Sequence, residues 1–299
     1  MRYVSAGAFR QAIDARLKRV VAELGEAQLV YTRRQIVFDR LLARLLAVQP
    51  ERWALKGGVA LTFRLQADTR VTRDLDLLLR ESPSDVDDAF QEAMRLDLED
   101  FFSFAVQGRR ELEHLDEASS IRYQILATLD GRRFDTFTID IGFDQPGSPP
   151  PDLVDGSDVL SFAGFERLRI PTIPIEVHLA EKLHAYVRSY GDDRPSTRVK
   201  DLVDMVLIGS NQYLVGGRMV RGIDHTFGTR ETVLPDRLPP PPVEWRRTYL
   251  ELAVSVGINP NLETGYAYAA SLFDPLLSRT IDPMAIWIHD ARSWSIGMM

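Results

Sequence analysis

The fold of this chain is decided by one stretch, Leu55-Lys56-Gly57-Gly58-Val59-Ala60-Leu61, which resumes at Thr72-Arg73-Asp74-Leu75-Asp76-Leu77. Residues 53–56 predict a short strand that ends at the glycine pair, and residues 59–65 predict a helix. Residues 74–79 alternate and then turn wholly apolar, as a strand of a covered sheet does. We therefore expect a strand, a glycine turn, a helix and a second strand.

The glycines and aspartates of this stretch predict a phosphate and metal site. Gly57 and Gly58 let the backbone approach a phosphate, and the helix N-terminus that follows presents N–H groups to the anion. Asp74 and Asp76 are two apart on a strand, so their side chains share a face. Mg²⁺ prefers a few carboxylates plus substrate phosphates. Asp-x-Asp alone is more often a solvated strand face, but two carboxylates entering a core unpaired are costly.

A third carboxylate is available on a later strand. Strands are expected at 101–106, 121–129, 134–143 and 168–173, with a hairpin at Asp130-Gly131. Asp140 lies in the third of these, and a two-metal site would use a third carboxylate on a neighbouring strand. The alternative is that Asp140 is a polar residue of an edge strand.

The rest of the chain is helical. Helices are expected at 6–25, 32–48, 84–96, 175–190, 197–208 and 244–256, and a loop or linker at 145–158. The fold class is therefore α/β (α+β) and two-lobed, with a small mixed sheet and a mostly helical C-terminal lobe. We place the domains at 1–158 and 159–299, the second contributing Lys182 and Asp204 to the active site.

Two of the helices carry the other candidate residues. In Glu176–Arg188, His178, Lys182 and Tyr186 are four apart and share a face, and Lys182 could reach a triphosphate. In Arg198-Val-Lys-Asp-Leu-Val-Asp204, two aspartates lie one turn apart. The alternative for both helices is a solvated, salt-bridged surface.

Composition excludes several classes. The 299 residues include no cysteine, so disulfides and thiolate metal sites are absent, and the five histidines lack zinc-ligand spacing. No stretch reaches the length of a membrane span, and residues 1–24 hold no signal-type apolar run, so we expect a cytoplasmic protein with no membrane partner. The net charge of −7 argues against a general nucleic-acid coat protein but leaves a local basic surface possible.

Together these motifs resemble the AbiEii family of nucleotidyltransferase toxins, to which the mycobacterial MenT toxins belong, within the DNA polymerase β-like nucleotidyltransferases. The motifs occur in the family's order over residues 50–210. The resemblance implies an Mg²⁺-dependent toxin of a toxin–antitoxin system. It would transfer a nucleotide from an NTP to the 3′ end of tRNA and so block translation.

The resemblance also assigns roles. Asp74 and Asp76 match the metal-binding carboxylates, Lys182 the lysine that contacts the nucleotide, and Asp204 the essential aspartate of the last motif. Gly57 and Gly58 match the glycine pair, and Thr72 a hydroxyl beside the metal that cognate antitoxins of some relatives phosphorylate. An antitoxin, in some systems a kinase that modifies Thr72, is therefore an expected partner. Asp140 matches no motif.

Two other functions stay open. The same chemistry could act on a small-molecule or protein hydroxyl, and a non-catalytic nucleotide-binding or antitoxin-binding protein is the third reading. A cleft lined by arginines such as Arg64, Arg70, Arg73 and Arg198 would favour tRNA as the acceptor; an acidic cleft would favour a small molecule.

Overall fold

The computed structural model describes residues 2–66, 72, 74–80, 86–114, 117–144, 147–188 and 198–296. The chain divides into two compact units, which are described separately. The first consists of Met1–Arg64, Val71–Pro146 and Pro151–Ile173, and the second of Leu65–Arg70, Gly147–Pro150 and Pro174–Met299. Residues 159–173 thus group with the first unit in this division, and the predicted boundary at residue 158 stays a prediction.

Two long helices open the first unit. Helix α1 (Ala6–Leu24) begins where the Ser5 hydroxyl accepts a hydrogen bond from the Ala8 N–H, which satisfies one of the end groups that a helix leaves unpaired. It ends at Gly25, whose φ of 87° breaks the helical path. Helix α2 (Glu26–Val48) starts directly after this glycine, six residues before the predicted start at residue 32.

A mixed sheet is the framework of this unit, as predicted. Its order is β3-β4-β5-β2-β1-β7-β6. The β2–β5 and β1–β7 pairs are parallel, and the other neighbours are antiparallel. The strands are β1 (Trp53–Lys56), β2 (Asp74–Leu79), β3 (Phe102–His114), β4 (Glu117–Leu129), β5 (Arg132–Phe143), β6 (Asp152–Asp155) and β7 (Arg169–Thr172).

The local sequence explains the hairpin between β4 and β5, but the sequence-based prediction omitted strand β6. Leu129 pairs with Arg132, so β4 and β5 are joined by Asp130 and Gly131, both with positive φ (55° and 65°). That backbone is the one a two-residue hairpin requires. The loop predicted at 145–158 is wrong in part, because β6 lies inside it and pairs with β7.

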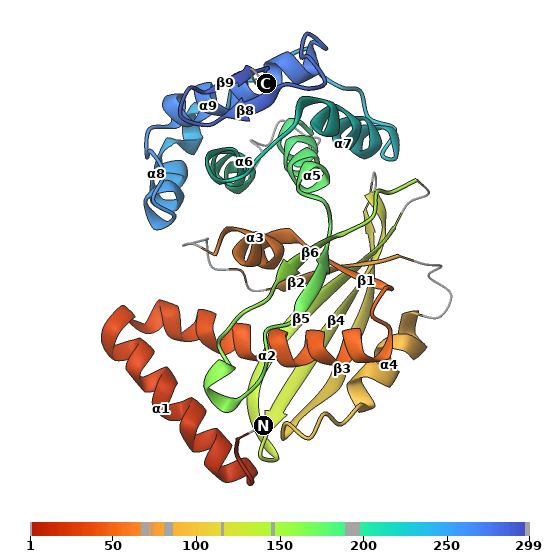
Figure 1. The fold of residues 1–299 in the computed structure, drawn as a ribbon, viewed down its shortest axis with the longest axis vertical. Helices are drawn as coiled ribbons and strands as arrows, with labels where there is room; N and C mark the ends of the chain where they lie inside the picture. Colours follow the sequence, from red (N-terminus) through yellow and green to blue (C-terminus); the bar gives the residue numbers. More distant parts are fainter. Residues whose placement is uncertain are drawn as a thin grey trace. The chain divides into compact units, whose positions relative to one another are not determined.

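One face of the sheet is buried and the other is polar. Leu75, Leu77 and Leu79 of β2 are fully buried, as are Ile139 and Ile141 of β5. Helix α2 and helix α4 (Val86–Arg95) pack against this face and complete the core (Figure 1). The residues between them, beginning with Asp74 and Asp76, point to the other face.

A buried arginine ties α2 to the start of β3. Arg44 has no exposed side-chain surface and donates two hydrogen bonds, of 2.8 and 2.7 Å, to the carboxylate of Asp100, which is equally buried. The same guanidinium donates to the carbonyl oxygens of Arg40, Leu96 and Phe102. Sequence patterns gave no sign of this pair, because both residues are of types that are normally exposed.

The second unit is built from helices. They are α5 (Ile175–Val187), α6 (Val199–Asn211), α7 (Gly216–Gly228), α8 (Arg246–Ser255) and α9 (Leu262–Leu277), followed by a hairpin of β8 (Ile286–Ile288) and β9 (Ser293–Ser295). The predicted helices at 175–190, 197–208 and 244–256 correspond to α5, α6 and α8. The predicted ends at residues 84, 189–190 and 197 lie outside the described residues. Among the described residues, no helix is long and apolar enough to span a membrane.

Replacing Arg44 with Met should lower the free energy of unfolding by about 3–5 kcal/mol, because the buried Asp100 carboxylate loses both hydrogen bonds from Arg44 and keeps the more distant Arg40 guanidinium, 3.7 Å away. Urea unfolding followed by circular dichroism measures this change. Arg247→Met is the control, because Arg247 is 91% exposed and its ion pair within the described part of the chain is with Glu251 one turn away. Equal stabilities of the two variants would show that the Arg44–Asp100 pair does not support the fold.

Candidate functional site

The turn between β1 and helix α3 (Gly57–Leu65) has room for glycine alone. Gly57 has a φ of +66°, and a Cβ there would lie 1.9 Å from Oδ2 of Asp76. A Cβ on Gly58 would lie 2.1 Å from Oγ1 of Thr72. Both distances are far below any van der Waals contact. The glycine pair therefore allows Asp76 and Thr72 to lie against the start of α3, where N–H groups have no partner within the helix.

The three predicted metal carboxylates share one face of the sheet. Asp74 and Asp76 are two apart on β2, and Asp76 is the register partner of Asp140 on the neighbouring strand β5. Register partners project to the same face, and adjacent strands lie about 4.8 Å apart. The sheet therefore brings Asp140 beside Asp76, as the choice of a neighbouring strand anticipated. Its role as a metal ligand stays a prediction.

Asp140 is bound by an arginine that sequence patterns did not single out. Arg122 of β4 donates from Nε to Oδ1 of Asp140 at 2.7 Å and from Nη2 to Oδ2 at 2.6 Å. The pKa of the Arg122 guanidinium is raised, first by this hydrogen bonding and then by the charges of Asp140, Asp74 and Asp76, while burial acts against them. Arg122 therefore lies in the field of all three carboxylates.

Asp74 and Asp76 are the described residues that best fit a divalent ion. Asp76 lies in a cradle that a Cβ on Gly57 would fill, and carboxylate oxygen is the donor that Mg²⁺ prefers. Within the described part of the chain no three carboxylate or histidine side chains are grouped as metal ligands. Both carboxylate oxygens of Asp140 accept hydrogen bonds from Arg122.

Lys182 and Asp204 meet inside the second unit. Nζ of Lys182 on α5 lies 2.9 Å from Oδ2 of Asp204 and 3.3 Å from Oδ1 of Asp201, both on α6. The Lys182 side chain is 12% exposed and the two aspartates at most 3%. The alternative of a solvated, salt-bridged surface is therefore wrong for these residues. That they join Asp74 in one active site stays a prediction.

Three histidines of the second unit and Tyr186 of α5 lie in structural surroundings. His178 and Tyr186, which share the Lys182 face of α5, are buried. His184 is buried against the ring of Phe227, and Nε2 of His225 lies 3.1 Å from the Ser148 hydroxyl. These contacts agree with structural rather than ligand-binding histidines.

Of the four arginines expected around the cleft, two have partners within the described residues and two lie outside those residues. Arg64 is bound inside the first unit, to Asp152 at 2.8 Å and to the carbonyl oxygen of Ile173. Arg198 lies 3.6 Å from Asp201 in the second unit. Arg70 and Arg73 lie outside the described residues. Arg122 and Asp201 are the residues the sequence reasoning did not assign, and only strand register and helix packing bring them to their partners.

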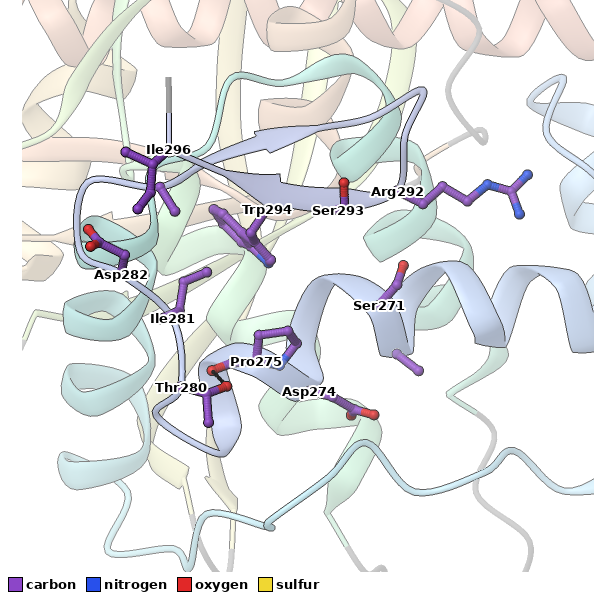
Figure 2. A pocket seen from close by; sticks show the side chains of 12 residues that line it. Ser271, Asp274, Pro275, Thr280, Ile281, Asp282, Arg292, Ser293, Trp294 and Ile296 are labelled. Carbon is purple, nitrogen blue, oxygen red and sulfur yellow. Dashed lines mark hydrogen bonds between the residues drawn. The ribbon is translucent and has the colours of Figure 1, made fainter. Parts of the chain in front are cut away.

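A separate hollow lies in the second unit, beside α9 and the β8–β9 hairpin (Figure 2). It has a volume of about 610 Å³ and is lined by residues that include Asp274, Thr280, Arg292 and Trp294. Its polar groups have partners in the fold: Trp294 donates to the carbonyl oxygen of Leu272, and Asp274 accepts from the Leu238 N–H. It contains none of the predicted site residues.

The comparisons with known proteins match most of the chain. The family described as "Nucleotidyl transferase AbiEii toxin, Type IV TA system" matches residues 40–264. The structure is similar to the nucleotidyltransferase toxin MenT4 (Rv2826c) of Mycobacterium tuberculosis H37Rv, with a TM-score of 0.55 and 20% identity over 89% of this chain and 90% of that one. This likeness supports the fold.

Two Helicobacter pylori structures are more distant. JHP933 has a TM-score of 0.41 and 13% identity over 83% of this chain and 92% of its own. A putative nucleotidyltransferase has a TM-score of 0.39 and 12% identity over 83% and 97%. No curated protein sequence matches the chain.

Replacing Gly57 with Ala should displace the Asp76 carboxylate and weaken divalent-ion binding, as measured by titration calorimetry with Mn²⁺ and Mg²⁺. Gly131→Ala is a matched control, because Gly131 has nearly the same φ (+65°) but nothing within 4 Å of its would-be Cβ. Both variants should lose about 1 kcal/mol of stability from the left-handed backbone. Only Gly57→Ala should lose ion binding; equal ion affinities would show that the close approach to Asp76 has no role in the site.

Proposed function

Because this chain belongs to the AbiEii family of nucleotidyltransferase toxins of toxin–antitoxin systems, we propose that it transfers a nucleoside monophosphate from an NTP to the 3′ end of a tRNA. The proposed cofactor is Mg²⁺, and the proposed setting is the cytoplasm, where the modified tRNA would stop translation. The acceptor and the metal come from the resemblance of the four motifs to the family.

The reaction is a displacement at phosphorus in which the chain must perform three tasks. The acceptor hydroxyl oxygen forms a bond to the α-phosphorus of the NTP, and the bond from that phosphorus to the oxygen bridging to the β-phosphate breaks. Pyrophosphate leaves with the electron pair, and the hydroxyl proton passes to a base or to water. The enzyme must hold the triphosphate, orient the hydroxyl and stabilise the negative charge that develops.

We assign the metal and the phosphates to the first unit. Asp74 and Asp76 would hold Mg²⁺, which when bound supplies positive charge at the reacting phosphates. Gly57 and Gly58 begin α3, whose first backbone N–H groups would bind the triphosphate beside Asp76 and Thr72. The observation that carries this assignment is the fit of the Asp76 carboxylate into the space beside Gly57, where any Cβ would clash.

We assign nucleotide contact to Lys182 in the second unit. Its ammonium is held at a fixed position by Asp204 and Asp201, so that it acts as an oriented point charge rather than a mobile surface lysine. In this reading Asp204 is a positioning residue, because it acts on the nucleotide through Lys182.

The test is label transfer from each of the four α-labelled NTPs to total tRNA in the presence of Mg²⁺. The wild-type protein should label tRNA with at least one NTP, and EDTA should abolish the label. Asp74→Asn and Asp76→Asn should each lower the rate at least 100-fold, because a carboxylate ligand is lost. Failure to label any RNA, with label on a small-molecule or protein hydroxyl instead, would replace the proposed acceptor.

Lys182 needs a different control, because removing it takes away a cation that two buried carboxylates share, although Arg198 still lies 3.6 Å from Asp201. Lys182→Ala can therefore lose activity simply by unfolding. Lys182→Arg keeps the charge and supports the ion pairs but places the cation differently. A folded Lys182→Arg variant with a large loss of transfer would support nucleotide contact, and one with wild-type activity would oppose it.

Phosphorylation of Thr72 by a cognate antitoxin should inactivate the protein. Thr72 Oγ1 is buried, has no hydrogen-bond partner among the described residues, and lies where a Cβ on Gly58 would be. A phosphate there would add about −1.5 to −2 charge near the carboxylates and crowd the glycine pair. Mass spectrometry after co-expression with the antitoxin should find phosphothreonine at position 72; unmodified Thr72 in a fully neutralised toxin would refute this regulation.

A further inference from the structure

A row of charged residues crosses the polar face of the sheet. Lys56 on β1 is the register partner of Asp76 on β2, Asp76 of Asp140 on β5, Asp140 of Arg122 on β4, and Arg122 of Arg110 on β3. Register partners project to the same face, so these five side chains form one line, here called the charge row (the strands lie side by side in Figure 1). Acidic residues lie at its centre and cations at both ends.

The β4–β3 end of the charge row is open to solvent. The Arg122 side chain is 45% exposed, and Arg110 and Gln124 are also exposed. The alternate residues of β4, Ile121 and Tyr123, are buried on the other face. This part of the sheet therefore has one face in the core and one polar face that other molecules can reach.

The two arginines at this end are an unusual pair. Like charges directly opposite each other on antiparallel strands destabilise a sheet. Asp140 neutralises Arg122, but Arg110 forms no ion pair with any described residue. Two neighbouring exposed guanidinium groups, of which only the inner one is paired with a carboxylate, have a net positive charge that a bound anion would relieve.

The opposite face of the same strand provides a contrast. A register shift between Val106 and Gly108 precedes Arg109, which pairs with Tyr123 and so projects to the face on the α4 side, where it stays partly exposed. There Arg109 donates to Asp87 at 2.9 Å and to Glu111 at 2.8 Å. The neighbouring arginine is therefore satisfied within the fold, whereas Arg110 is not.

Spacing relates the arginines to the candidate metal site. With strands about 4.8 Å apart, Arg122 lies two strands from Asp76 and Arg110 three, or about 10 and 14 Å away. Arg122 is held in place by two parallel hydrogen bonds to Asp140, which fix the plane of its guanidinium. An acceptor strand whose last hydroxyl lies at Asp74 and Asp76 could run along this face with its phosphates over the arginines.

We propose that Arg122 and Arg110 bind the backbone phosphates of a polynucleotide acceptor, and that Asp140 serves to orient Arg122. The proposal rests on the proposed function and adds the surface that receives the acceptor. A polynucleotide is the occupant because it carries regularly repeated negative charge, which the exposed end of the charge row complements and which a small-molecule hydroxyl lacks.

Transfer kinetics with total tRNA provide the test. Arg110→Gln and Arg122→Gln should each raise the KM for tRNA about tenfold, because a charge-assisted phosphate contact is lost, with the KM for NTP nearly unchanged. In binding measured by fluorescence anisotropy, the double variant should reduce the slope of log affinity against log salt by about 1 to 2. Arg109→Gln is the matched control and should leave both quantities as in the wild type.

The outcomes separate the two proposals. Transfer to tRNA by the wild type, with KM and salt slope unchanged in both arginine variants, would refute the docking surface and leave the function intact. No transfer to any RNA would refute the function and with it the docking surface. Arg122→Lys, which keeps the charge but loses the paired hydrogen bonds to Asp140, should be intermediate; a KM equal to that of the wild type would refute the orienting role of Asp140.

Discussion

The absence of a side chain at Gly57 is the constraint on which the candidate site depends. Strand β1 ends there, helix α3 begins there, and the carboxylate of Asp76 fills the space that a Cβ would take. The positive φ of Gly57 turns the chain sharply enough for helix and strand to approach this closely. Gly58 makes the same allowance for Thr72. The start of α3, where we propose phosphate binding, and the strand that we propose holds the metal can therefore share one corner of the first unit.

Strand register places further charged residues on the same face of the sheet as this corner. Because side chains alternate between faces, the pattern that buries Leu75 and Leu77 also fixes Asp74 and Asp76 on the opposite face. The neighbouring strands β5 and β4 repeat the pattern, so the same core packing that stabilises the sheet aligns its polar residues. A slip of one residue in any strand would move a charged side chain into the core. The same strand register is thus required both for a stable fold and for the placement of the site residues.

Buried ion pairs have a structural role in the first unit, whereas in the second unit they also hold a proposed site residue. In the first, Arg44 and Asp100 are buried together and join a helix to the start of a strand. In the second, Lys182 is almost buried between Asp201 and Asp204. Breaking either would leave a buried carboxylate with weaker compensation in a low-dielectric interior. A lysine that supports the fold and is also proposed to contact a nucleotide therefore requires tests that separate stability from activity.

The sequence by itself determined the strand–glycine–helix–strand unit, the pair Asp74 and Asp76, the mixed sheet and the long helices, because these follow from local periodicity and from residues whose conformation is special. The start of α2 and the strand β6 were missed, since only packing and pairing with distant segments define them. Tertiary structure alone decided that Arg122 binds Asp140, because a contact between strands depends on register, which local patterns do not specify. It also decided that Asp204 is buried against Lys182, because two amphipathic helices reveal their shared face only when they pack.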